Sequence, residues 1–160
     1  MKKYVALVLA MLMALCLCAA CGDSGTAVVD NDPGMDAISA AVQKTADNEN
    51  MTDIPESYLE TMLKLTADDY TECYARISSV GTNIDEYGVF KTDDPDSMKK
   101  ALDKYLEYRE MIWMDEYLPQ EHPKLQNAQV WAEGNYVMYA ILDTNTLNCT
   151  ETAFKGCFEG

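Results

Sequence analysis

Acid–base groups are abundant in this 160-residue chain, which has 27 Asp and Glu residues but one histidine. General acid–base catalysis needs a titratable group placed against the reacting atoms, and His122 beside Glu121 is of the right type. No serine or cysteine can be identified as its nucleophile, and the common hydrolase, phosphate-loop, zinc-protease and dinucleotide motifs are missing. The sequence therefore predicts no catalytic residue and makes His122 a surface-loop side chain.

Carboxylates alone could also carry hydrolysis, and Glu86, Asp115 and Glu116 are the candidates. Such chemistry requires two carboxylates close together in a pocket that raises the pKa of one of them. Their spacing does not show that any two converge. A carboxylate-dependent hydrolase or transferase therefore stays an alternative hypothesis.

A charged pair lies on the apolar side of the longest predicted helix. Arg109 and Glu116 fall near the centre of that side by angle, and a guanidinium held there can grip a carboxylate or phosphate bidentately. This makes both residues candidate ligand-binding residues. Alternatively, the end of the helix extends beyond the sheet and its last turns are exposed to solvent. The apolar side itself is formed by Met98, Leu102, Tyr105, Ile112 and Trp113.

Aromatic and methionine side chains form the third candidate. Trp131, Tyr136 and Met138 lie on one face of a predicted hairpin, opposite the face expected to form the core. If that face is exposed, it is an apolar patch of the kind that marks a binding surface. The alternative is that the two N-terminal helices cover it.

Metal and disulfide chemistry are not expected. Asp93, Asp94 and Asp96 could hold a cation, but they lack the glycine and the twelfth-position glutamate of a calcium loop, and helix capping explains them better. Cys73, Cys149 and Cys157 do not match zinc-ligand spacing. Their odd number indicates no disulfide framework, so free buried thiols are expected, with a pair between Cys73 and either Cys149 or Cys157 as the alternative. No cofactor is predicted.

The N-terminus has the order of an export signal. Lys2 and Lys3 precede an apolar run, and small residues lead to Cys21. Residues 4–20 would span about 25 Å as a helix, less than the roughly 30 Å of hydrocarbon in a bilayer. A secretory signal and an uncleaved membrane helix are the alternatives.

Around Cys21 the chain resembles the lipobox of bacterial lipoproteins, with Cys18 where leucine is usual. The resemblance implies removal of residues 1–20 and a diacylglycerol thioether on Cys21, which would anchor the protein on the extracytoplasmic face of the cell membrane. Two or more acyl chains give stable anchoring.

Composition limits the partners. The net charge is −15, and loss of Lys2 and Lys3 with the signal would make it −17. This balance argues against nucleic acid and against a domain lying on anionic lipid, and it is compatible with basic partners or cations. We expect three segments: a signal peptide (1–20), a lipidated cysteine followed by a Gly/Asp-rich tether (21–33), and one domain (34–160). The domain is long enough to bury its own hydrophobic core.

Hydrophobic periodicity predicts an α+β fold. Two hairpins form a four-stranded antiparallel sheet with the long helix across one face, plus N-terminal and C-terminal helices. In the second hairpin, a turn at Gly134-Asn135 places Ala132 opposite Val137 and Val130 opposite Tyr139. The predicted helices are 35–46, 55–64, 95–117 and 147–158, and the predicted strands are 70–80, 84–91, 128–132 and 136–142.

Several segments in this order resemble the family called domain of unknown function 4358, small lipoproteins of Firmicutes. They are the run from Asp85 to Lys91, then Tyr117-Leu118-Pro119, Asn127 to Val130, and Gly134 to Val137. The resemblance covers roughly residues 35–158. The resemblance implies a single domain with the membrane localisation of a lipoprotein, and it implies no established activity.

The first functional hypothesis is a non-enzymatic, membrane-anchored module that binds a protein or small ligand at the cell envelope. It predicts an exposed Tyr/Trp/Met patch. A substrate-binding lipoprotein of a transporter is an alternative, although one domain lacks the two lobes that usually close around the ligand. The hydrolase is the other alternative.

Overall fold

The computed structural model describes residues 32–114 and 116–159. The predicted signal peptide, Cys21 and Asp115 lie outside the described residues. The elements in chain order are α2 (Met35–Ala46), β1 (Met51–Asp53), α3 (Glu56–Tyr58), η1 (Leu59–Leu63), β2 (Glu72–Ser78), β3 (Glu86–Lys91), α4 (Pro95–Met111), α5 (His122–Gln126), β4 (Gln129–Glu133), β5 (Tyr136–Ile141) and α6 (Thr144–Gly156).

The α+β class with an antiparallel sheet is confirmed, but the sheet has five strands and not four. The strand order is β1-β2-β3-β5-β4, and every neighbouring pair is antiparallel. β1 was not predicted because three residues are too few to show a period of two. The predicted register of the second hairpin is confirmed, with Ala132 opposite Val137 and Val130 opposite Tyr139. Gly134 in its turn has φ 55°, which glycine adopts without steric cost.

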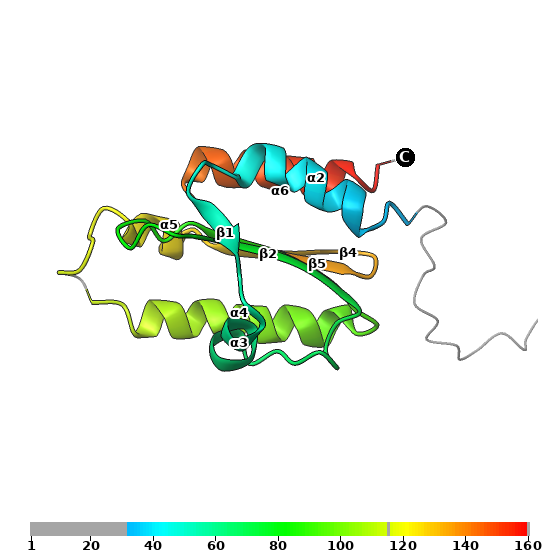
Figure 1. The fold of residues 1–160 in the computed structure, drawn as a ribbon, viewed down its shortest axis with the longest axis horizontal. Helices are drawn as coiled ribbons and strands as arrows, with labels where there is room; N and C mark the ends of the chain where they lie inside the picture. Colours follow the sequence, from blue (N-terminus) through cyan, green and yellow to red (C-terminus); the bar gives the residue numbers. More distant parts are fainter. Residues whose placement is uncertain (1–31, 115, 160) are drawn as a thin grey trace, which may run out of the picture.

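The sheet lies between two layers of helices (Figure 1). α2 and α6 lie side by side on one face, and α4 with the short α3–η1 segment covers the other. Both faces of the sheet are therefore buried. The first core contains Ile38, Val42, Tyr87, Val89, Trp131, Met138 and Phe154. The second contains Leu63, Phe90, Leu102, Tyr105, Val137, Tyr139 and Ile141.

This two-layer covering corrects the expectation of an exposed aromatic face. Trp131, Tyr136 and Met138 are 7%, 2% and 0% exposed, because α2 and α6 pack over them. The N-terminal helix does cover this face, as the alternative held. It does so with the C-terminal helix as its partner, while α3 and η1 pack on the opposite side.

The long helix begins where predicted but ends earlier. The Asp94 side chain accepts a hydrogen bond from the Ser97 N–H (2.9 Å), with Pro95 in the first turn, so Asp94 caps the helix as expected. The helix ends at Met111 and not near residue 117. Trp113 instead stacks on His122, with ring centroids 5.3 Å apart, and the unpredicted α5 follows.

The segment predicted as a helix over 55–64 contains an unusual turn. Its second part, η1, is a π-helix, and the Leu59 carbonyl accepts hydrogen bonds from the N–H groups of both Lys64 and Leu65. Lys64 ends it in the left-handed region with φ 60°. Single-turn π-helices and left-handed non-glycine residues are both uncommon and occur often at functional sites.

The end of the predicted tether is fixed to the domain. Asp32 accepts hydrogen bonds from Lys91 Nζ (2.8 Å), the Tyr136 hydroxyl (2.6 Å) and the Gly34 N–H (2.9 Å). These bonds, that from Lys91 first, lower the pKa of Asp32 from 3.8 to about 2. α2 starts three residues later, so Asp32 fixes the position at which the N-terminal segment joins the domain. All described helices and strands lie after it, so a chain starting at Gly22 keeps both cores.

We expect Asp32→Asn to weaken the fold at neutral pH and to do so much less at pH 2. A carboxyl whose pKa is depressed on folding stabilises the protein fully above its unfolded pKa near 3.8, and this contribution is lost as the pH falls through the folded pKa of about 2. Asp32 is half exposed, so solvent screening keeps the effect within about 1 kcal/mol. Urea unfolding of residues 22–160 between pH 6 and pH 2 measures this difference in the free energy of unfolding. The control is Glu49→Gln, which also removes one exposed negative charge. A constant difference between wild type and Asp32→Asn over that range would contradict the assignment.

None of the helices in the described part of the chain combines the length and the apolar character needed to cross a membrane.

Candidate functional site

The run from Asp85 to Lys91, which carries the sequence resemblance, forms the central strand β3 and the residue before it. Alternate side chains serve opposite layers. Tyr87 and Val89 belong to the core under α2 and α6, and Phe90 belongs to the core under α4. Gly88 lies opposite Tyr139, and a Cβ on Gly88 would come within 2.7 Å of the Tyr139 ring. The glycine therefore gives Tyr139 its place on the sheet.

Glu86, on the α4 side of this strand, is a fully buried carboxylate, 0% exposed. Its Oε1 accepts hydrogen bonds from the hydroxyls of Tyr105 (2.6 Å) and Tyr139 (2.7 Å). Its Oε2 accepts from Arg109 (2.8 Å) and the Tyr58 hydroxyl (3.2 Å). We call Glu86, Arg109, Tyr58, Tyr105 and Tyr139 the buried charge cluster.

Electrostatics keep the donors of this cluster protonated. Burial, followed by the charge of Glu86, raises the pKa of Tyr58, Tyr105 and Tyr139 above the usual value of 10. Burial lowers the pKa of Arg109, but electrostatic attraction to the hydroxyl oxygen of Tyr105 and to the carboxylate of Glu86 outweighs burial and raises the pKa above its usual value. Hydrogen-bonded charge pairing of this kind is what a buried carboxylate requires.

The predicted role of Arg109 therefore needs correction. Arg109 does grip a carboxylate, but that carboxylate is the chain's own Glu86, and its guanidinium also donates to the hydroxyls of Tyr58 and Tyr105. Glu116 is not part of the arrangement, because α4 ends at Met111 and Glu116 is exposed beyond it. The two residues do not form the predicted charge site.

The buried charge cluster was not predicted because its five residues come from α3, β3, α4 and β5. A signal for it does exist in the sequence. Glu86 shares a strand face with Phe90, and Arg109 lies on the apolar side of the helix expected to cover that sheet. An acid and a base on two facing apolar surfaces would predict their pairing, since neither charge can be buried alone.

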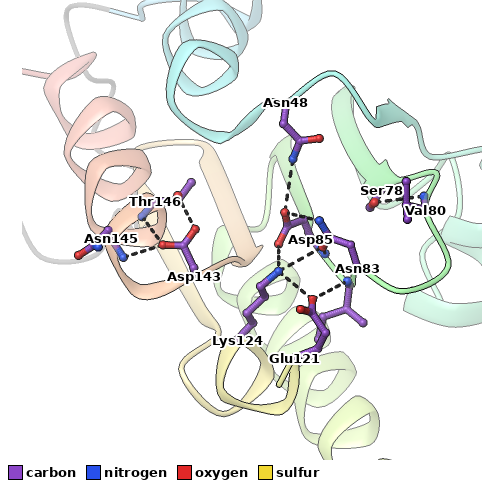
Figure 2. Close-up of polar contacts among 11 residues, drawn as sticks. Asn48, Ser78, Val80, Asn83, Asp85, Glu121, Lys124, Asp143, Asn145 and Thr146 are labelled. Carbon is purple, nitrogen blue, oxygen red and sulfur yellow. Dashed lines mark hydrogen bonds and ion pairs between the residues drawn. The ribbon is translucent and has the colours of Figure 1, made fainter. Parts of the chain in front are cut away.

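A second polar network fixes the loop before β3 to α5, as Figure 2 shows. Lys124 donates to Asp85 (2.7 Å), Glu121 (2.7 Å) and Asn83 (3.2 Å), and the three charged side chains are at most 17% exposed. Glu121 also accepts a hydrogen bond from the Ile84 N–H (3.2 Å). This cation is held by the protein itself, and the network joins elements rather than presenting a free group.

Other predicted candidates are structural too. His122 is at the start of α5, hydrogen-bonded to Glu110 (2.9 Å) and stacked on Trp113, so it is more closely packed than a surface-loop residue. Cys73, Cys149 and Cys157 are free thiols, but Cys149 is exposed and the other two are half-buried, which corrects the expectation of buried thiols. Burial raises the pKa of Cys73 to about 12. No group of His, Cys, Asp or Glu within residues 32–114 and 116–159 could hold a metal ion.

An exposed apolar surface lies elsewhere, at the end of α4. Of the six large apolar side chains exposed in the described residues, five lie between Tyr108 and Tyr117. We call these the distal patch: Tyr108, Met111, Ile112, Met114 and Tyr117, which are 44%, 73%, 46%, 65% and 53% exposed. The sixth, Val80, adjoins them, since the Tyr117 hydroxyl donates to the carbonyl of Gly81 (3.3 Å).

The distal patch lies at one end of the long axis of the molecule (Figure 1). The loop from α4 to α5 is at that end, and the start of α2 is at the other. Because Asp32 is fixed near the start of α2, the segment that carries the distal patch lies at the opposite end of the molecule from the point where the N-terminal segment joins the domain.

Comparison with known families identifies the sequence class. The family described as Domain of unknown function (DUF4358) matches residues 44–142. The chain belongs to this family. The comparisons with curated proteins and with solved structures gave no match.

The DUF4358 segment contains the five strands, α4 and α5, and with them every residue of the buried charge cluster and the distal patch. It leaves out α6 and most of α2, the layer over the other face of the sheet. The resemblance to the family is thus confirmed. Its lipoprotein and Firmicutes features stay predictions.

Proposed function

We propose that this protein is a lipid-anchored, extracytoplasmic module that binds another envelope protein through the distal patch and catalyses no reaction. The observation that carries the proposal is the exposure of five large apolar side chains in one ten-residue stretch. Soluble domains bury most such side chains, and a contiguous exposed group marks an interaction surface. Methionine and tyrosine are frequent at such surfaces because they adapt to a partner or anchor it.

The surroundings of the distal patch indicate the chemistry of the partner. Glu107, Glu110 and Glu116 are exposed beside its apolar side chains, and the whole chain has a net charge of −15. We therefore propose a protein partner with an apolar surface surrounded by basic side chains. Anionic lipid is disfavoured as the occupant, because acidic side chains repel it.

The position of the distal patch supports the anchored arrangement. The proposed anchor on Cys21 precedes Asp32 by eleven residues, a span of at most about 40 Å when fully extended. The domain would thus stand near the membrane with the distal patch on its far side, where another envelope protein can reach it.

The two alternative functions have less support. For a carboxylate-dependent hydrolase, Glu86 is the buried carboxylate, but its oxygens already accept four internal hydrogen bonds. For a transporter's substrate-binding lipoprotein, the fold offers one sheet with helices on both faces and not two lobes.

Photocrosslinking in intact cells of the natural host tests the proposal. We expect a photoreactive amino acid at Met111 or Met114 in the full-length protein to give a discrete protein adduct, and the same amino acid at exposed Glu49 or Thr152 to give none. The captured protein should then bind purified residues 22–160. The double substitution Met111→Ser with Tyr117→Ser should weaken this binding about tenfold or more, because buried aromatic anchors dominate interfaces. Equal adducts at all four positions, or binding unaffected by the double substitution, would refute the distal patch.

The anchor has its own test. Full-length Cys21→Ala should leave the membrane fraction for the soluble fraction or medium, whereas the wild type stays bound. Membrane retention of Cys21→Ala would contradict lipid anchoring and leave the distal patch to be judged by the crosslinks.

A further inference from the structure

A cavity between η1 and α4 adjoins the buried charge cluster, with which it shares Tyr105, and its lining has an unusual charge. Its volume is about 750 Å³, in the range of small-molecule sites. We call it the lysine groove. It is lined on the η1 side by residues 61–64 and on the α4 side by Ser97, Lys100, Ala101, Lys104, Tyr105 and Tyr108.

Three lysines line the groove and no acid does. Lys64 comes from the end of η1, and Lys100 and Lys104 come from successive turns of α4. In a chain with 27 acidic and 12 basic residues, a lining of this composition is the reverse of the overall balance.

These lysines also lack partners in the described part of the chain. Six of its ten Lys and Arg residues form ion pairs with Asp or Glu. The four that form neither an ion pair nor a side-chain hydrogen bond there are Lys44, Lys64, Lys100 and Lys104, and three of these meet at the groove. The neighbouring Lys99 shows the contrast, since it pairs with Asp103 one turn along α4 (2.9 Å).

The arrangement has an energetic cost without a ligand. Lys100 and Lys104 are like charges four residues apart on a helix, a spacing that destabilises it by about 0.2–0.5 kcal/mol. Lys64 has φ 60°, a conformation that costs a non-glycine residue about 1 kcal/mol or more. Both costs place positive charge at the same cavity, which indicates that an anion belongs there.

Most of the remaining lining is apolar, with the hydroxyl groups of Thr61 and Ser97 as its other polar side chains. Met62 and Leu63 face the groove from η1, and Ala101 and Tyr105 face it from α4. Leu63 and Tyr105 are themselves part of the buried core, so this wall is fixed. A ligand that matches both parts has an apolar chain or ring and an anionic head.

We propose that the lysine groove binds an anionic amphiphile, with Lys64, Lys100 and Lys104 at its phosphate or carboxylate head and Met62, Leu63 and Ala101 along its apolar part. Tyr108 lies at the edge of both the lysine groove and the distal patch, but the residues proposed to hold the ligand are not part of the distal patch. Free organic anions and anionic lipid headgroups share this chemistry.

Calorimetric titration of residues 22–160 with decyl phosphate and decanoate, kept below micelle formation, tests the site. We expect saturable 1:1 binding, with inorganic phosphate and decyl maltoside each at least about tenfold weaker because they lack one of the two matching parts. Lys100→Gln with Lys104→Gln should weaken binding of decyl phosphate about tenfold or more. Ala101→Leu, which fills the groove and keeps the charge, should do the same.

The matched control is Lys44→Gln with Lys99→Gln, which removes two positive charges outside the groove lining and should leave affinity within about twofold. Equal weakening by this pair would overturn the proposal, as would no saturable binding, or maltoside or inorganic phosphate binding as tightly as decyl phosphate. Cosedimentation with phosphatidylglycerol vesicles separates the sources: loss of cosedimentation in the groove variant identifies a lipid headgroup, and binding of the free amphiphile alone identifies a soluble anion.

Discussion

Replacing Arg109 by methionine is expected to lower the free energy of unfolding by about 3–5 kcal/mol, because it leaves Glu86 buried without its counter-ion. Methionine retains most of the apolar stem, so the loss reports the charge rather than a cavity. The three tyrosine hydroxyls can still donate to the carboxylate, but none of them carries a positive charge. Urea unfolding of residues 22–160 at pH 7, followed by tryptophan fluorescence, measures the change.

The matched control is Lys155→Met, which breaks a partly exposed pair with Glu151 on α6. Exposed pairs contribute at most about 1 kcal/mol, so this variant should resemble the wild type. Arg109→Lys keeps the charge and should fall between the two. If Arg109→Met and Lys155→Met proved equally mild, the buried charge cluster would not hold α4 to the sheet.

Phe154→Ala is expected to destabilise the domain by about 3–5 kcal/mol. Phe154 is fully buried between α6 and the sheet and contacts the Phe158 ring edge-on, with centroids 5.3 Å apart. Truncation removes apolar burial and leaves a cavity in the core that contains Trp131. The same urea titration serves here, and Trp131 reports directly on this core.

Asn148→Ala, an exposed change on the same helix, should stay within about 0.5 kcal/mol of wild type. The comparison also tests whether the segment matched by the family is stable without α6, because Phe154 lies outside that segment. A mild Phe154→Ala would mean that α6 is an appendage and that residues 44–142 carry the stability. A severe one would make the C-terminal helix a necessary part of this chain's fold.

Hydrophobic periodicity predicted most of the fold because most elements are long enough to show it. The first helix was predicted with its observed bounds, and four strands were found within a few residues. The end of α4 could not be predicted from helix signals. The prolines at 119 and 123 are the local stop signals, but the stacking of Trp113 on His122 ends the helix sooner.

The candidate sites were harder to predict because they depend on which elements meet. Patterning identified Trp131 and Tyr136 as an apolar face but could not tell that α2 and α6 would cover it. Arg109 was singled out as a candidate ligand-binding residue because it lies on the apolar side of the long helix, whereas its partner Glu86 is 23 residues away in sequence. The lysine groove depends on a π-helix, whose wider turn has no simple sequence signal.

The outer strands of the sheet limit how copies of this protein can associate. β1 has three residues and β4 has five, so each edge offers few unpaired backbone N–H and C=O groups. Short edges are a common protection against strand pairing between chains, the first step towards cross-β aggregation. Many copies can therefore crowd on one surface with little tendency to polymerise through their backbones, which leaves contact with other proteins to side chains.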